Sequence, residues 1–181
     1  SQLYVQSKSF DEIYEMAKNK SEMLSCIPAI MPVKGTDIYR ISSYYGQRTD
    51  PFYKVTKFHG GIDFSGPVGL GIYATGDGIV KKVEKNKSGY GNNILIDHGY
   101  GYMTRYAHLH SFKVKKGQKV KRGQEIGTMG NTGKSTAPHL HYEVIKNNKT
   151  VNPINFFYND LTPEEYDKIL ELSQHPSQTM D

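Results

Sequence analysis

Five of the seven histidines in this chain occur in three settings that suit metal binding or proton transfer. These settings are His59 with Asp63, His108 with His110, and His139 with His141. Imidazole nitrogen and carboxylate oxygen are common protein ligands of zinc. Imidazole is also the side chain best suited to exchanging protons near neutral pH. The histidine pattern therefore directs attention to hydrolytic metal chemistry.

The spacing within two of these settings places the side chains on one side of the backbone. Residues i and i+2 of a β-strand share a face, so His139 and His141 are expected to point the same way. Two consecutive glycines separate His59 from Ile62 and Asp63, and they disfavour a helix by about 2 kcal/mol relative to two alanines. We therefore expect an extended segment there. Together, His59, Asp63, His139 and His141 supply three zinc ligands and a fourth side chain that need not bind metal.

A zinc ion with three protein ligands keeps its fourth position open to water, as catalytic zinc sites do. The pKa of such a water falls from about 15.7 towards about 7, which provides hydroxide at neutral pH. The sequence contains no H-E-x-x-H motif, so any base for this chemistry has to be a nearby histidine. His98 and His110 are instead expected in turns or at the surface, and His175 lies in the tail. The pattern predicts a catalytic zinc site.

Further motifs surround these histidines between about residues 38 and 157. In order they are Tyr45-Gly46-Gln47-Arg48, Pro51, Phe58 to Phe64, Gly89 to Asn92, Ile96 to Gly99, Tyr106 to Leu109, Val120, Gly123, Gly127, Gly130, Thr132-Gly133 and Ala137 to Glu143. In these segments and in their order, the sequence resembles the lysostaphin-like (LytM-type) zinc metalloendopeptidases. The chain departs from the family at Ala137, where glycine is usual, and at Tyr142, where phenylalanine is usual. Neither departure removes a ligand. Arg48 matches a family position, and a structural salt bridge would explain it equally.

The resemblance implies which residues act. It assigns one Zn²⁺ per chain to His59, Asp63 and His141 as metal ligands. It assigns activation of the metal-bound water and stabilisation of the tetrahedral oxyanion to His108 and His139, which do not bind metal. Which of these two histidines is the general base is left open by the resemblance.

The resemblance also implies hydrolysis of peptide bonds, in cross-links or stem peptides, of bacterial cell-wall peptidoglycan. Such an enzyme works outside the cytoplasmic membrane, so we expect an exported, cell-envelope protein, either periplasmic or held by a membrane anchor upstream of this chain. The alternative is a latent or non-catalytic wall-binding regulator of other peptidoglycan hydrolases, with residues 1–37 as a candidate block. Because this chain retains all five site residues, the enzyme is the favoured hypothesis.

Short apolar or alternating runs separated by glycine and asparagine extend from about residue 38 to residue 158. This pattern predicts a mainly β domain, an antiparallel sheet sandwich or barrel-like structure with an active-site groove, flanked by an N-terminal and a C-terminal helix. We expect a helical stalk or linker at 1–37, the zinc metallopeptidase domain at 38–158, and a helix with a tail at 159–181. Gly99-Tyr100-Gly101 is expected to turn one strand into the next.

Two helices are expected outside the β region. Ser9 and Glu12 have the spacing of a capping box at the start of an amphipathic helix over residues 9–25. That helix would pack on the domain or continue an upstream coiled coil. Thr162 and Glu165 have the same spacing at the start of the C-terminal helix.

The composition limits the partners. The chain has 181 residues with 23 Lys and Arg against 18 Asp and Glu, and its formal net charge of +5 suits an anionic partner such as a wall polymer. The strongest basic run, residues 113–122, lacks interleaved aromatics, so it predicts a solvated hairpin with Val114 and Val120 inward and no nucleic-acid binding.

No apolar run approaches the roughly 18 residues of a membrane helix. The single cysteine, Cys26, excludes cysteine-based zinc fingers. The oligomeric state is not predicted.

Overall fold

The computed structural model describes residues 2–34, 40–49 and 55–174, with side chains from Phe10 onward. Within these residues the chain forms thirteen strands and two α-helices, and the strands pair antiparallel. The predicted fold class is confirmed. Three predicted features lie outside the described residues. They are the expected boundary between residues 37 and 38, Pro51 of the family-like segments, and residues 175–181 of the C-terminal tail.

The largest sheet has eight strands and carries most of the candidate site. In pairing order its strands are β1 (Ile41–Ser43), β4 (Ile62–Ser65), β12 (His139–Lys146), β8 (Tyr102–Ala107), β7 (Asn93–Gly99), β6 (Gly78–Glu84) and β10 (Lys119–Val120), while β13 (Lys149–Val151) pairs with β12. Strand β12 therefore lies between β4 and β8, so residues far apart in sequence meet along it.

Two smaller sheets complete the β domain. One contains β5 (Gly71–Tyr73), β11 (Glu125–Met129) and β9 (Leu109–Phe112), and the other is the pair β2 (Gly46–Thr49) and β3 (Thr56–His59). Buried side chains of the eight-stranded and three-stranded sheets belong to one hydrophobic core, to which the 3-10 helix η2 (Pro153–Phe156) and helix α2 (Pro163–Ser173) contribute Ile154 and Ile169.

Strand β12 is buried on both faces, and its alternation separates packing from chemistry. Leu140, Tyr142 and Val144 point into the hydrophobic core. His139 and His141 point to the opposite face, because successive strand residues alternate. The core side chains therefore fix the strand while the polar side chains are presented to the other side of the sheet.

The predicted turn at Gly99-Tyr100-Gly101 is confirmed. Gly99, Tyr100 and Gly101 all have positive φ, at 74°, 52° and 80°, and they connect β7 to β8. Glycine adopts such angles without steric cost, and the tight reversal uses two of them. The basic run at residues 113–122 does not form the predicted hairpin, because β9 before it pairs with β11 and β10 within it pairs with β6. Val114 and Val120 are nevertheless buried, as expected.

Helix α1 spans Gln2–Cys26, so the predicted start at Ser9 is wrong. Neither glycine nor proline occurs between residues 2 and 26, and nothing local stops the helix from continuing upstream of the capping-box pattern. The helix ends just before Pro28, as expected.

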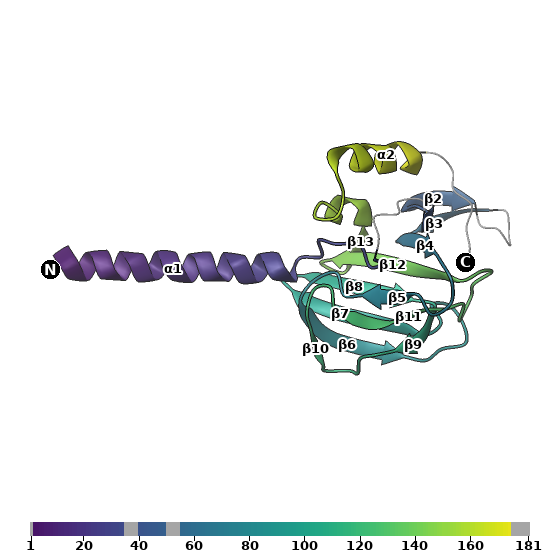
Figure 1. Cartoon of the computed structure of the whole chain (residues 1–181), viewed down its shortest axis with the longest axis horizontal. Helices are drawn as coiled ribbons and strands as arrows, with labels where there is room; N and C mark the ends of the chain where they lie inside the picture. Colours follow the sequence, from purple (N-terminus) through teal and green to yellow (C-terminus); the bar gives the residue numbers. More distant parts are fainter. Residues whose placement is uncertain (1, 35–39, 50–54, 175–181) are drawn as a thin grey trace.

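The apolar stripe of α1 is exposed. Phe10, Ile13 and Tyr14 are 69%, 61% and 61% exposed, and Figure 1 shows α1 extending away from the sheets. The expectation that this helix packs on the domain is therefore wrong, and its continuation as a coiled coil stays a prediction. Among the described residues, no helix combines the length and the apolar character needed to cross a membrane.

The C-terminal end of α1 is held by Arg122. Its guanidinium donates hydrogen bonds to the carbonyl oxygens of Leu24, Ser25 and Ile27. The backbone N–H of Asp77 donates to Ser25 O at 2.9 Å, and Asp77 Oδ1 accepts from the Arg122 N–H at 2.8 Å. Carbonyls in the last turn of a helix lack partners within the helix, and a cation satisfies them well. This joint fixes the direction in which α1 leaves the β domain.

Helix α2 begins as the sequence predicts. Thr162 Oγ1 accepts from the Glu165 N–H at 3.2 Å, and Glu165 Oε2 accepts from the Thr162 N–H at 2.8 Å, which is a complete capping box. The helix buries Ile169 against the core.

Candidate metal centre

Three side chains converge from β3, β4 and β12. His59 Nε2 is 3.1 Å from Asp63 Oδ1 and 3.0 Å from His141 Nδ1, and His141 Nδ1 is 2.8 Å from Asp63 Oδ1. Asp63 and His141 are partners in the register of β4 and β12, which is how residues 78 positions apart come together. All three side chains are buried, and these three atoms could together hold a metal ion.

The two glycines between His59 and Asp63 let β3 turn directly into β4. His59 is the last residue of β3 and Asp63 lies in β4, so the expected extended conformation is confirmed. A Cβ atom at Gly61 would collide with the carbonyl oxygen of Tyr142 on β12. Glycine is therefore required where this turn approaches β12, and the approach brings His59 against His141.

A second hydrogen bond orients each histidine ring of this cluster. His59 Nδ1 donates to the Tyr44 carbonyl oxygen at 2.8 Å, and His141 Nε2 donates to Glu143 Oε1 at 3.1 Å. Partners of this kind fix the tautomer and the orientation of a metal-binding imidazole. They leave Nε2 of His59 and Nδ1 of His141 to face the same point.

Arg48 holds the carboxylate of the cluster. Its guanidinium NH1 donates to Asp63 Oδ2 at 2.9 Å and to Ser43 Oγ at 2.7 Å. The side chains of Arg48 and Asp63 are 9% and 0% exposed, so this is a buried ion pair. The salt-bridge interpretation of Arg48 is confirmed, and Asp63 Oδ1 is turned towards the two histidines.

Burial and charged neighbours shift the pKa values of the cluster in opposite directions. Burial lowers the pKa of His141, but the carboxylates of Asp63 and Glu143 outweigh it and raise that pKa to about 10. Burial raises the pKa of Asp63, yet His141 and His59 hold it well below its ordinary value. Without metal, the cluster is an imidazolium between two carboxylates. A cation would take the place of that proton, and the N, O, N donor set suits a metal such as zinc.

His108 and His139 lie beside the cluster, with ring centroids 4.6 Å apart, and the His108 ring is 6.1 Å from that of His141. His108 Nδ1 donates to the Thr132 carbonyl oxygen at 2.7 Å, and His139 Nδ1 donates to the Ala137 carbonyl oxygen at 2.9 Å. These bonds place the proton of each neutral ring on Nδ1 and make Nε2 the acceptor nitrogen. The structure thus brings all five predicted site residues together.

His108 occupies a backbone conformation that residues other than glycine rarely adopt. Its φ is 60°, at the single residue between β8 and β9. Its N–H donates to the Tyr90 carbonyl oxygen at 2.9 Å. Left-handed residues of this kind persist where the surrounding structure enforces them, and they cluster at functional sites.

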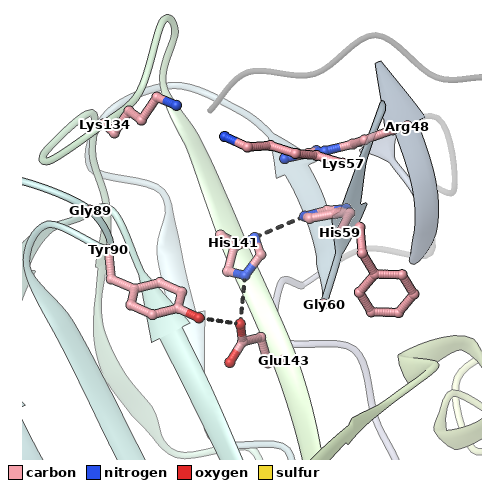
Figure 2. A pocket seen from close by; sticks show the side chains of 10 residues that line it. Arg48, Lys57, His59, Gly60, Gly89, Tyr90, Lys134, His141 and Glu143 are labelled. Atoms are coloured by element: carbon pink, nitrogen blue, oxygen red, sulfur yellow. Dashed lines mark hydrogen bonds and ion pairs between the residues drawn. The ribbon is translucent and has the colours of Figure 1, made fainter. Parts of the chain in front are cut away.

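A cavity of about 270 Å³ opens over the cluster. Its lining residues are Arg48, Lys57, Phe58, His59, Gly60, Gly89, Tyr90, Lys134, His141 and Glu143. Figure 2 shows His59 and His141 joined directly by a dashed line, with Glu143 linked to both His141 and Tyr90. Among the described side chains of residues 10–34, none lines the cavity.

Comparison with known proteins decides the family. The family model described as Peptidase family M23 matches residues 57–153, which is just over half of the chain and includes the whole cluster. This chain belongs to peptidase family M23. The catalytic domain of lysostaphin from Staphylococcus simulans is 32% identical with a TM-score of 0.57, covering 64% of this chain and 89% of that chain. The predicted lysostaphin-like family is confirmed.

Relatives within family M23 match the same region. Peptidoglycan DD-endopeptidase ShyA of Vibrio cholerae is 50% identical over 115 residues, 63% of this chain and 26% of that protein. DD-carboxypeptidase/endopeptidase Mpg of Neisseria meningitidis is 44% identical over 115 residues, 64% of this chain and 26% of that protein. The chain spans about a quarter of the length of these curated relatives. A solved zinc-containing peptidase from Vibrio cholerae is 42% identical with a TM-score of 0.63, covering 70% of this chain and 39% of that chain.

A second layer of polar residues behind the cluster was not predicted from the sequence. Glu143 Oε1 accepts from the Tyr90 hydroxyl at 2.7 Å, and Glu143 Oε2 accepts from Arg105 NH1 at 3.2 Å. Burial and the Glu143 charge raise the pKa of Tyr90 to about 12, so its hydroxyl remains a donor. The period of two along β12 was the available signal, because it places Glu143 on the face of His139 and His141.

The other histidines of this M23 chain do not join the cluster within the described residues. His98 is buried, at 3% exposed, so its expected surface position is wrong. It lies on the same side of β7 as Ile96, which points into the core, and its Nδ1 donates to the Asp77 carbonyl oxygen at 2.7 Å. His110 is exposed, as expected, and His175 lies outside the described residues.

Proposed function

We propose that this chain is a zinc-dependent endopeptidase that hydrolyses peptide bonds, in cross-links or stem peptides, of bacterial cell-wall peptidoglycan. The observation that carries this proposal is the meeting of three ligand atoms, 2.8 to 3.1 Å apart, beside two further histidines that are not needed to hold metal. The names of the M23 relatives, peptidoglycan DD-endopeptidase and DD-carboxypeptidase/endopeptidase, agree with this substrate and reaction.

His59, Asp63 and His141 are the proposed zinc ligands, and they bind one ion per chain. Bound zinc supplies a Lewis acid for the scissile carbonyl and lowers the pKa of the attacking water. His59 Nε2, His141 Nδ1 and Asp63 Oδ1 face one point, where they would hold the ion. Because their second hydrogen bonds already orient these side chains, they need to rearrange little when the ion binds.

His108 and His139 are the proposed catalytic pair. With Nδ1 protonated and bonded to a backbone carbonyl in each ring, Nε2 can accept a proton from the attacking water. The protonated ring can then stabilise the oxyanion and return the proton to the leaving amine. Either histidine can take either part.

The proposed reaction takes place outside the cytoplasmic membrane, because peptidoglycan lies there. We therefore propose that the chain is exported to the cell envelope, in the periplasm or facing the wall. A latent role requires something that covers the cavity, and among the described side chains of residues 10–34 none lines it.

Digestion of isolated peptidoglycan sacculi tests the proposal. The purified chain is incubated with sacculi after zinc loading, and again with a chelator, and the released muropeptides are identified by mass. We expect loss of cross-linked dimers or shortening of stem peptides that stops with the chelator. Release of no peptide product by protein shown to contain one zinc per chain would instead favour a regulatory role.

A further inference from the structure

At His108 the chain passes from the eight-stranded sheet to the three-stranded sheet. Strand β8 ends at Ala107, which pairs with His141 of β12, and β9 begins at Leu109, which pairs with Met129 of β11. The change of sheet takes place within a single residue, whose φ is 60°. A residue other than glycine keeps this conformation only where its surroundings enforce it.

The backbone of His108 is held differently from that of His139. His139 begins β12 and pairs with β4, so the ladder of the sheet fixes it. His108 lies between two strands, and the segment that precedes β7 supports it. Its N–H donates to the Tyr90 carbonyl oxygen at 2.9 Å, and the N–H of Leu109 donates to the Asn92 carbonyl oxygen at 2.9 Å. The peptide groups on both sides of His108 are thus held by one segment.

Thr132, in the loop between β11 and β12, joins that segment to the start of β9. Thr132 Oγ1 accepts from the Asn92 N–H at 3.0 Å and donates to the Leu109 carbonyl oxygen at 3.0 Å. The carbonyl oxygen of the same threonine accepts from His108 Nδ1 at 2.7 Å. One residue therefore contacts the segment that supports His108, the residue that follows His108, and the His108 ring.

Glycines allow Thr132 to come this close. A Cβ atom at Gly91 would collide with the backbone and the hydroxyl of Thr132, and a Cβ atom at Gly133 would collide with the backbone of Gly89 and Gly91. The approach of the two segments is therefore set by backbone packing. A change of the Thr132 side chain can then test the hydroxyl while the path of the chain is kept.

We propose that Thr132 is a positioning residue for the catalytic pair, which holds the backbone and the ring of His108 in place. The centroid of this ring lies 4.6 Å from that of His139 and 6.1 Å from that of His141. The inference rests on the proposed endopeptidase function, in which His108 is one of the two histidines that exchange a proton. Thr132 acts through His108 and does not itself transfer the proton. Because a displacement of about 1 Å at a reacting group can cost about 10²-fold in rate, the effect belongs in kcat.

Thr132→Val tests the hydroxyl, because it keeps the volume and the backbone carbonyl and removes both side-chain hydrogen bonds. Rates are measured on a soluble cross-linked muropeptide dimer. We expect kcat to fall at least about tenfold, with KM changed less than about threefold and one zinc still bound per chain. Thr132→Ser keeps the hydroxyl and should retain kcat within about threefold. Thr132→Ala removes the same hydroxyl and replaces the valine variant if that variant does not fold.

Two comparisons separate positioning from a general loss of stability. In a His108→Ala background, Thr132→Val should change kcat by less than about twofold, because the group that it positions is gone. Thr128→Val is the matched control. Thr128 Oγ1 is 2.7 Å from Ser111 Oγ across the pair of β11 and β9, so this variant removes a hydroxyl from the same sheet and should leave kcat unchanged. Thermal unfolding is measured for every variant.

Nitrogen NMR of the zinc-loaded chain at pH 7.5 gives a readout that needs no substrate. In the unmodified chain we expect one tautomer of the His108 ring, with the proton on Nδ1, because the Thr132 carbonyl oxygen accepts there. In Thr132→Val a second tautomer of His108 should become detectable. The signals of His59, whose Nδ1 donates to the Tyr44 carbonyl oxygen, should not change.

The outcomes distinguish this inference from the proposed function. Unchanged kcat in Thr132→Val, or an equal loss in the unmodified and His108→Ala backgrounds, overturns the positioning role while the endopeptidase stands. A single, unchanged His108 tautomer in Thr132→Val overturns it as well. If the unmodified chain cleaves neither the dimer nor sacculi, the proposed function fails, and the tautomer of His108 still decides whether Thr132 holds its ring.

Discussion

His141 and Glu143 lie two residues apart on one face of β12, and the Nε2 atom of the histidine is 3.1 Å from Oε1 of the glutamate. This bond holds the proton of the neutral ring on Nε2 and leaves Nδ1 for the metal. Glu143 is itself held by Tyr90 and Arg105, so the orientation of His141 depends on side chains from β8 and from the segment that precedes β7. The candidate metal centre therefore extends beyond its three proposed ligands.

Glu143→Ala is expected to lower metal affinity by about 10- to 100-fold, the range measured when such outer partners are removed. Glu143→Gln keeps an oxygen that can accept from His141 Nε2, so its loss should be smaller. Zinc affinity is measured by competition with a chromophoric chelator at constant pH. Glu164→Ala, on the exposed start of α2, is the matched control and should bind zinc normally. Unchanged affinity in Glu143→Ala would contradict its orienting role.

His139→Ala and His108→Ala are expected to keep zinc and to lose about 10²- to 10⁴-fold in kcat, the usual contribution of a general acid or base. Asp63→Ala removes a ligand atom and should lower both zinc content and activity. Metal analysis and muropeptide release are measured on the same preparations. Retained wall digestion by His139→Ala would refute the role proposed for this histidine.

Arg48→Met is expected to destabilise the metal-free chain by about 3 kcal/mol, because it breaks the buried ion pair with Asp63 and leaves Asp63 Oδ2 without its cationic donor. In the zinc-loaded chain the loss should be smaller, since the ion compensates the same charge. Urea unfolding with and without chelator gives both values. Lys82→Met breaks the exposed pair with Glu84 and should cost less than about 1 kcal/mol. Equal losses of stability in the two variants would show that the buried Arg48–Asp63 pair stabilises the fold no more than the exposed Lys82–Glu84 pair.

The β domain could be predicted from local patterns, and the five site residues from those patterns together with the family resemblance, which assigns the roles and alone singles out His108. Glycine turns and strand alternation fix the positions of His59, Asp63, His139 and His141 on their own elements. His98 was misplaced because a single histidine at the end of β7 does not reveal that its face of the strand is buried. Interactions between elements distant in sequence carry no comparable local pattern.

The same difference between local patterns and distant contacts explains why the packing of α1 and the partners of Glu143 were not predicted. The apolar stripe of α1 predicts burial, but whether the domain or another helix covers it depends on the direction fixed by Arg122, 95 to 98 residues away from the carbonyls it binds. Tyr90 and Arg105 meet Glu143 only through the pairing of β8 with β12 and the path of the chain before β7.

Arg122→Met is expected to loosen the end of α1 without affecting hydrolysis. The variant removes the donor to Leu24 O, Ser25 O and Ile27 O, so these carbonyls depend on water or on weaker partners. Hydrogen exchange of the last turn of α1 should become faster, by about tenfold or more, while exchange in β12 stays unchanged. Lys119→Met, on the exposed face of β10, is the control. Unchanged exchange in α1 would mean that Asp77 and the remaining contacts hold the joint alone.

His98 predicts a loss of stability in mild acid. Burial lowers its pKa below the ordinary 6.5, despite the opposing hydrogen bond to Asp77 O and the nearby charges of Asp97 and Asp77. The unfolded chain therefore binds a proton at a pH where folded His98 does not, and stability falls as pH drops from 6.5 through the lowered pKa. The slope contributed by this group is at most about 1.4 kcal/mol per pH unit. Urea unfolding of metal-free protein at pH 7.5 and 5.5 measures it. Subtracting the pH dependence of His98→Gln cancels the other titrating groups, and a difference of zero between the two proteins would show that His98 does not contribute.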